Sequence, residues 1–157
     1  IFLIVPATCQ LSHSSKTSMT AYLVDTNVWS EILKKEPNSQ VIAWMREHEA
    51  SLYVSTVTIG ELKYGIDRLA DGRRKRAFQT WLTALIARMQ GRVLNYNTSV
   101  ATIWGQLQAK SERRGIRLPS LDSQIAATAL RHSLVVATRN EKDFNHTGLK
   151  TKNPFNA

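Results

Sequence analysis

Residues 22–29 are Tyr22-Leu23-Val24-Asp25-Thr26-Asn27-Val28-Trp29, and this pattern predicts a short β-strand that ends at a carboxylate and leads directly into a helix. Thr26 and Asn27 carry side chains that favour a helix start. In an open parallel α/β sheet, ligands bind beyond the carboxyl ends of the strands, so Asp25 is expected at the functional edge. Taken alone, the stretch fits equally well an Asp25 that only caps the helix, because Asp is a preferred N-cap residue.

The composition predicts one globular domain with an anionic partner. The chain has 157 residues, of which 43% are hydrophobic, and this suits a single sizeable core. Lysine and arginine outnumber aspartate and glutamate by 21 to 12, and the net charge of +9 favours a nucleic acid or an acidic protein as partner. The single cysteine, Cys9, excludes an intramolecular disulfide framework and, without clustered histidines, a structural zinc site. These features fit a protein of the reducing cytoplasm.

The first eighteen residues differ in composition from the rest. Residues 1–7 are apolar but too few to span a membrane, which takes about 20 residues, and no basic segment precedes them as in a signal peptide. We therefore expect no transmembrane helix and no membrane partner. Residues 10–18 are mostly polar and rich in serine, and Met19 directly precedes the first strand. We interpret residues 1–18 as a non-native or disordered leader and residues 19–157 as the folded domain.

Strands and helices are expected to alternate along the remaining chain. The predicted strands are 22–24, 52–55, 92–94 and 134–137, with a short edge strand within 149–155 that Pro154 limits. The predicted helices are 28–33, 39–46, 56–65, 72–89, a helix that begins at 97–99, and 123–130. The basic run Arg73-Arg74-Lys75-Arg76 is more often a solvated helix face than a binding patch, although a basic chain raises the odds of contact with RNA. No repeat or linker divides the chain.

Four carboxylates fall just after a strand or at a helix start: Asp25, Glu61, Asp122 and Asp143. If the sheet is parallel, they converge at one edge. Converging carboxylates repel one another unless a cation neutralises them, and hard oxygen ligands select Mg²⁺ or Mn²⁺. A metal held in this way can activate water and stabilise charge on a phosphodiester. The pattern therefore predicts metal-dependent hydrolysis of a nucleic acid; the alternative, four unrelated helix caps at one edge, is less plausible.

The sequence around these acids resembles the PIN domain. The matching motifs are Leu23-Val24-Asp25-Thr26-Asn27, Thr58-Ile59-Gly60-Glu61-Leu62 with Tyr64-Gly65, Asp122-Ser123-Gln124-Ile125-Ala126-Ala127, and Ala137-Thr138-Arg139-Asn140 with Asp143-Phe144. Over residues 21–155 the ordered set is similar to the VapC-type toxins of bacterial toxin–antitoxin pairs, in the branch that includes the FitB-like proteins. Each motif is common alone, but the ordered set is specific.

The resemblance implies a three-layer α/β/α sandwich around a mainly parallel sheet, and an endoribonuclease that uses Mg²⁺ or Mn²⁺. Asp25, Glu61, Asp122 and Asp143 match the acidic quartet of the family. By this resemblance Asp25 and Asp122 hold the metal, and Glu61 and Asp143 complete the site directly or through water.

The resemblance also assigns supporting residues. Thr26 and Asn27 match a polar pair that supports the first Asp, and Asn140 matches a polar residue near the fourth acid. Arg139 is a candidate for a phosphate contact or for an ion pair with one of the acids. Asn97 stands where many relatives have an acidic residue, and we interpret it as a helix cap.

Two further departures, Ser123 where a small residue is usual and Gly60 where alanine is common, leave every carboxylate in place.

The implied partners are a second copy of the chain, a cognate antitoxin that inserts a peptide into the acidic pocket, and operator DNA bound through that antitoxin. Trp29, Ile32 and Leu33 are candidates for the antitoxin groove, although core packing is at least as good an interpretation of each.

Three other classes of protein share some of these features. A haloacid-dehalogenase-like phosphatase needs a second Asp two positions after the first, where this chain has Asn27. A receiver-like phospho-acceptor domain needs a Lys directly after a late strand, and here Thr138 and Arg139 follow Ala137. A toxin partner that acts mainly as a co-repressor in a DNA-bound complex, with little nuclease activity, is compatible with the sequence.

Overall fold

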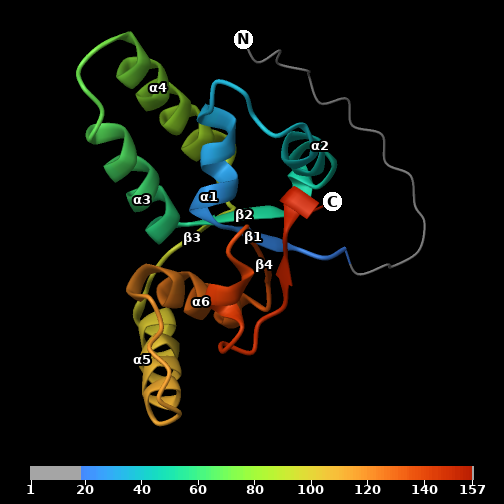
Figure 1. Cartoon of the computed structure of the whole chain (residues 1–157), viewed down its shortest axis with the longest axis vertical. Coiled ribbons are helices and arrows are strands. Elements are labelled where there is room, and N and C mark those ends of the chain that lie inside the picture. Colours follow the sequence, from blue (N-terminus) through green and yellow to red (C-terminus); the bar gives the residue numbers. More distant parts are fainter. Residues whose placement is uncertain (1–18, 157) are drawn as a thin grey trace.

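A parallel sheet lies at the centre of the computed structural model, which describes residues 19–156 (Figure 1). Its strands are β1 (Tyr22–Val24), β2 (Leu52–Ser55), β3 (Val93–Leu94), β4 (Val135–Ala137) and β5 (Thr151–Lys152). Their order across the sheet is β3-β2-β1-β4-β5, and each neighbouring pair is parallel. The predicted leader, residues 1–18, lies outside the described residues.

The central position of β1 explains its apolar sequence. Leu23 and Val24 have no exposed surface, and Val54 and Val136 on the neighbouring strands are equally buried. Leu23 pairs with Tyr53 of β2 on one side and with Val136 of β4 on the other. Strands covered on both faces read as nearly continuous apolar runs. Because the pairing is parallel, β1, β2 and β4 all end at the same edge of the sheet.

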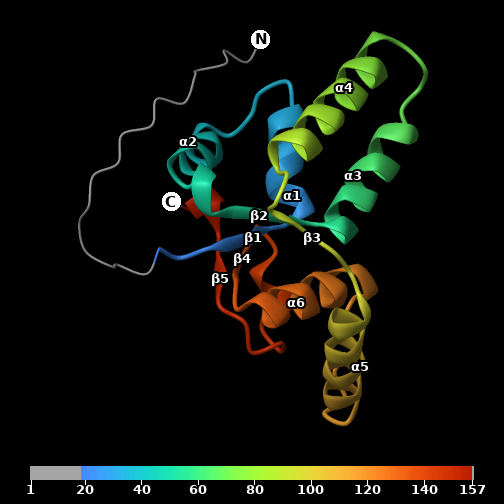
Figure 2. The same cartoon turned by 180° about the vertical axis from the view of Figure 1, so that it is seen from behind.

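Helices cover both faces and make a three-layer α/β/α sandwich, as predicted (Figure 1 and Figure 2). One face carries α1 (Thr26–Trp29), α2 (Ser39–Glu47), α3 (Thr56–Asp67) and α4 (Arg73–Arg88); the other carries α5 (Thr98–Glu112) and α6 (Ser120–His132). Short 3-10 helices are η1 (Ser30–Leu33), η2 (Glu49–Ser51), η3 (Glu141–Phe144) and η4 (Pro154–Asn156). Val24 packs with the first group of helices and Leu23 with the second, because successive strand residues face opposite ways.

The predicted helices are present, but several ends differ. The helix predicted at 28–33 begins two residues earlier as α1 and continues as η1. Gly65 does not end α3, which runs on to Asp67, because the buried Ile66 packs in the core and holds the last turn in place. α6 begins at Ser120, three residues before its expected start. Within residues 19–156, none of the helices is both long and apolar enough to cross a membrane.

Polar side chains fix the starts of three helices. Asn38 caps α2, and Ser55 Oγ accepts the N–H of Thr58 at 2.9 Å at the start of α3. Asn97 Oδ1 accepts the N–H of Val100 at 3.1 Å, which confirms its predicted role as the cap of α5. Each cap satisfies a backbone donor that the first turn of a helix leaves free.

Ser123 of α6 links the two helices of the second face. Its hydroxyl accepts hydrogen bonds from Trp104 Nε1 at 3.0 Å and Gln108 Nε2 at 3.1 Å, both on α5. The same hydroxyl donates to the carbonyl of Ser120 at 2.8 Å, and the residue is only 1% exposed. These contacts give a physical reason for a serine at this position.

The substitution Ser123→Ala should lower the free energy of unfolding by about 1–2 kcal/mol, because two donors on α5 lose their acceptor. Urea unfolding followed by circular dichroism measures the change. Ser39→Ala, at the exposed start of α2, is the matched control and should alter stability by less than about 0.5 kcal/mol. Equal effects of the two substitutions would show that the Ser123 hydroxyl is not a structural link.

Candidate active site

All four predicted carboxylates lie near the starts of α1, α3, α6 and η3, on the side of the sheet at which β1, β2 and β4 end. Asp25 directly follows β1, and Glu61 lies in the second turn of α3. Asp122 is in the first turn of α6, and Asp143 is in η3, which follows β4. The parallel topology thus gathers acids that are up to 118 residues apart, from 25 to 143, on one side of the molecule.

Asp25 is the most enclosed of the four, with 3% of its surface exposed. Its Oδ1 accepts the N–H of Thr26 at 2.7 Å, so the residue does cap α1. Its Oδ2 accepts from Asn27 Nδ2 at 2.7 Å and from Thr138 Oγ1 at 2.7 Å. Burial raises the pKa of Asp25, and the three hydrogen bonds offset part of that rise. Asp25 is therefore both the cap of α1 and a residue of the candidate site.

Thr138 is a site residue that the sequence reasoning missed. It directly follows β4, has no exposed surface, and binds Asp25 through its hydroxyl. The same hydroxyl accepts the N–H of Asn140 at 3.0 Å. Val24 pairs with Ala137, so parallel register alone makes residues 25 and 138 neighbours. A polar residue directly after the strand that pairs with β1 is the signal that would have found it.

Glu61 is joined to Asp25 through Thr26. Thr26 Oγ1 donates to Glu61 Oε2 at 2.6 Å, while the backbone N–H of the same threonine binds Asp25. Burial raises the pKa of Glu61; the hydrogen bond from Thr26 opposes that rise, and the charge of Asp25 adds to it. Thr26 therefore positions two of the four acids relative to each other.

Asp122 carries the clearest electrostatic sign that the acids face one another. Partial burial raises its pKa to about 6, and the charges of Asp25, Asp143 and Glu61 add to the rise in that order. Asp143 also raises the pKa of Asp25, after the larger effect of burial. The charges of Asp25, Asp143 and Glu61 therefore all act on the carboxyl of Asp122 and make it harder to ionise.

The carboxylate oxygens are suitable ligands for a hard divalent cation, but they do not form a complete coordination shell. Across residues 19–156, no three acidic, histidine or cysteine side chains lie close enough together to enclose an ion. The gathering predicted from sequence is looser than a complete ligand set. Mg²⁺ is commonly held by one or two carboxylates with waters in its other positions. Here every acidic donor is an oxygen, and Asp25 has lone pairs left beyond its three hydrogen bonds, so this partly hydrated mode suits the site.

The other supporting residues divide into those that contact the site and those that do not. Asn27 Oδ1 accepts the backbone N–H of Arg139 at 3.0 Å, so the side chain of Asn27 ties α1 to the segment after β4. The Arg139 guanidinium lies 5.3 Å from the ring centroid of Phe155 rather than on an acid. Asn140 contributes its backbone N–H, which binds Thr138.

One of the three candidate antitoxin contacts is wrong. Trp29 is only 4% exposed and packs in the core, because its side chain faces the sheet. Ile32 and Leu33 are half-buried.

The PIN domain family model matches residues 22–150. The VapC ribonuclease Y4jK of Sinorhizobium fredii is 35% identical over 135 residues, which cover 85% of this chain and 96% of the relative. Toxin FitB of Neisseria gonorrhoeae is also 35% identical over 135 residues, covering 85% and 97%.

The fold is shared with a solved structure of FitAB bound to an IR36 DNA fragment. The TM-score is 0.80 and the sequence identity 32%, over 85% of this chain and 95% of that chain. The residues that the family model matches include all four carboxylates. The chain belongs to the PIN-domain family, in the group that contains the VapC and FitB proteins.

Proposed function

We propose that this protein is the toxin of a toxin–antitoxin pair and that it hydrolyses RNA phosphodiester bonds with Mg²⁺ or Mn²⁺ held by carboxylates. The observation that carries the proposal is a buried, hydrogen-bonded Asp25 on the side of the sheet where Glu61, Asp122 and Asp143 also lie. Support comes from relatives named VapC ribonuclease and toxin FitB. The site would act on RNA as an endonuclease.

Asp25 and Asp122 are the proposed metal ligands, with Glu61 and Asp143 completing the site directly or through water. Asp25 is held rigidly by Thr26, Asn27 and Thr138, so it can present its remaining lone pairs in a fixed direction. A bound divalent cation would supply Lewis acidity that activates water and balances the charge of the phosphodiester. The carboxylates themselves repel a polyanion, so the positive charge of the rest of the chain has to draw the RNA in.

The proposed partners follow from the same relatives. They are a cognate antitoxin, a second copy of the chain, and operator DNA reached through the antitoxin. The solved FitAB complex with DNA supports the antitoxin and the operator for a protein of this group. The half-buried Ile32 and Leu33 stay candidates for the antitoxin groove, and the cytoplasm is the proposed location.

The substitution Asp25→Asn should abolish cleavage of total RNA by the purified, antitoxin-free protein, because it removes the buried charge that holds the cation. Cleavage is measured with Mg²⁺ or Mn²⁺ and again with EDTA, which should also stop it. Asp71→Asn, a fully solvated acid remote from the site, is the matched control and should cut normally. RNA that stays intact with either metal, from a protein that still binds antitoxin and operator DNA, would replace the nuclease with the co-repressor interpretation.

Removing the Asp122 charge should change how the stability of the metal-free protein depends on pH. The ordinary pKa of 3.8 rises to about 6 in the folded protein, so the folded state holds this proton more tightly than the unfolded state. The resulting stabilisation is complete below 3.8 and is lost as the pH rises through about 6.

Asp122→Asn should therefore unfold at higher urea than the wild type at about pH 7.5 in EDTA, and the advantage should shrink at about pH 5. Added Mg²⁺ should stabilise the wild type more than the variant, because only a folded site binds it. Asp71→Asn should follow the wild-type pH profile. An Asp122→Asn profile parallel to the wild type would mean that this carboxylate does not face the others.

Thr138→Val should reduce cleavage about 10- to 100-fold, because the buried Asp25 loses a donor and becomes free to turn. Thr138→Ser keeps the hydroxyl and should restore most of the activity. Initial rates at saturating RNA and Mg²⁺ measure both. A serine variant as slow as the valine variant would point to packing of the threonine methyl group instead of the hydrogen bond.

A further inference from the structure

Tyr64 is a large aromatic side chain exposed beside the acidic edge. Among residues 19–156 the exposed large hydrophobic side chains are Met19, Tyr64, Ile86 and Leu121. Tyr64 lies on α3, one helical turn after Glu61, and 65% of its surface is exposed. Tyr64 is the aromatic one among these four side chains, and its position one turn after Glu61 places a flat apolar surface close to the acids.

Helical spacing places Glu61, Tyr64 and Arg68 on one strip of α3. Residues three and four apart lie on the same side of a helix, with Cβ atoms about 5–6 Å apart. Glu61 is bound to Thr26, which in turn binds Asp25, so the strip starts inside the acidic site. Tyr64 therefore stands at the rim of the site, within the reach of a nucleotide whose phosphate contacts the acids.

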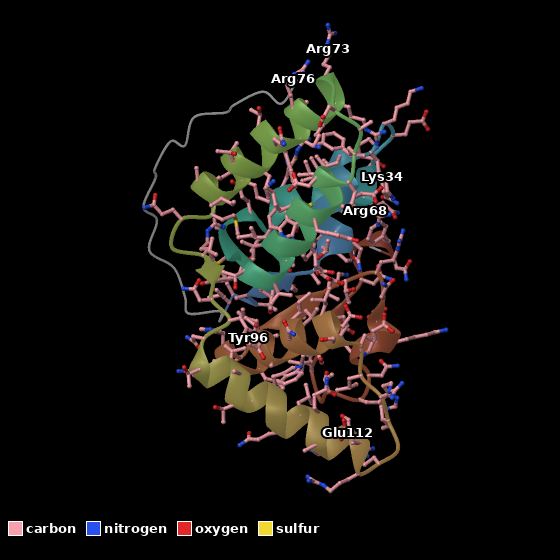
Figure 3. The ribbon with its side chains drawn as sticks, turned by 90° about the vertical axis from the view of Figure 1, so that its left-hand side faces the viewer. Lys34, Arg68, Arg73, Arg76, Tyr96 and Glu112 are labelled. Carbon is pink, nitrogen blue, oxygen red and sulfur yellow. The ribbon has the colours of Figure 1, made fainter. Side chains whose placement is uncertain are left out.

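Arg68 supports the ring of Tyr64. Its guanidinium carbon lies 5.5 Å from the ring centroid, a cation–π contact that covers one face of the ring. Figure 3 shows Arg68 and Lys34 on the same side of the molecule in that view. A ring held on one face by a cation presents its other face to solvent and carries positive charge with it.

Gly60, one turn before Tyr64, and Gly65, the next residue, leave parts of the helix surface near the ring without side chains. Gly60 and Gly65 are exposed in the interior of α3, and a Cβ placed on either would meet no atom within 4 Å. Glycine within a helix costs stability relative to alanine. Packing within the described chain does not account for this cost, and the space is open to a molecule from outside.

We propose that Tyr64 stacks on a nucleobase of the RNA strand whose phosphodiester occupies the acidic site, with Arg68 holding the ring and attracting the adjacent phosphate. The assignment rests on the proposed function, because it takes RNA as the substrate. Single-stranded RNA is recognised through unstacked bases that lie on aromatic rings or arginine planes. Tyr64 would therefore favour a substrate whose base is free to leave its own stack.

The surrounding charge favours RNA over a second copy of this chain as the occupant. Arg68 lies against the exposed ring, and the chain as a whole carries a charge of +9. A second copy brings the same excess of positive charge, whereas RNA brings the opposite sign and an aromatic face in every nucleotide.

Steady-state cleavage of a short single-stranded RNA with Mg²⁺ tests the stacking. Stacking is made equally in the bound and the reacting complex, so its loss raises KM and leaves kcat nearly unchanged. Tyr64→Leu should raise KM about 10- to 100-fold with kcat within about twofold, and Tyr64→Phe should stay close to wild type, because it keeps the ring. Ile86→Ala, which removes an exposed apolar side chain on α4, is the matched control and should leave both constants unchanged.

A direct readout of stacking uses RNA strands with 2-aminopurine at one position, moved along the strand, mixed with excess protein in Mg²⁺ and followed from the moment of mixing, before the strand is cut. The fluorescence of the base should change with the wild-type protein and with Tyr64→Phe, and this change should be lost with Tyr64→Leu. Sedimentation of each variant without RNA checks the oligomeric state.

The possible outcomes separate the two proposals. Wild-type cutting with an unchanged KM and an unchanged fluorescence signal for Tyr64→Leu overturns the stacking and leaves the nuclease in place. A Phe variant as weak as Leu, or a Leu variant with a different oligomeric state, also overturns it. Ring-dependent fluorescence without any cleavage by the wild type supports the stacking and defeats the nuclease. RNA that is neither cut nor bound defeats both.

Discussion

The parallel pairing of β1 with β4 is the constraint on which the rest of the site depends. It sets Val24 opposite Ala137 and so brings the next residues, Asp25 and Thr138, into contact. A buried carboxylate is costly unless hydrogen bonds replace its water. The replacements for Asp25 come from α1 and from the end of β4, which are 111 residues apart at Asn27 and Thr138. The acid is therefore supported only when the whole sheet has assembled.

The site works against the stability of the protein that holds it. Burial and mutual repulsion raise the pKa of Asp25, Glu61 and Asp122, which means that the ionised forms are disfavoured in the folded state. Hydrogen bonds from Thr26, Asn27 and Thr138 offset part of this cost. A bound cation would relieve the part of this cost that the hydrogen bonds do not offset. The repulsion between carboxylates that destabilises the metal-free protein would therefore strengthen metal binding.

Local signals predicted most of the fold, and tertiary contacts decided what they missed. The strand before Asp25 and the cap at Asn97 follow from a few neighbouring residues, and both are in place. Thr138 could be assigned only from the register of β1 against β4, which a single sequence does not state. The length of α3 past Gly65 depends on core packing of Ile66, and the place of Arg139 depends on Phe155 in the distant 3-10 helix η4. Long-range contacts of this kind leave no periodic signal.

The rotation of α3 connects the core to the chemistry. Thr58, Leu62 and Ile66 recur at intervals of four and are at most 4% exposed, so this face of the helix is fixed against its neighbours. Because that face is buried, Glu61 and Tyr64 lie on the outer side of the helix. Glu61 projects toward the other acids and Tyr64 toward solvent. The distance between acid and ring is then set by one rigid helical turn rather than by a loop. A nucleotide that contacts both would be held in one orientation, because neither group can move independently of the core.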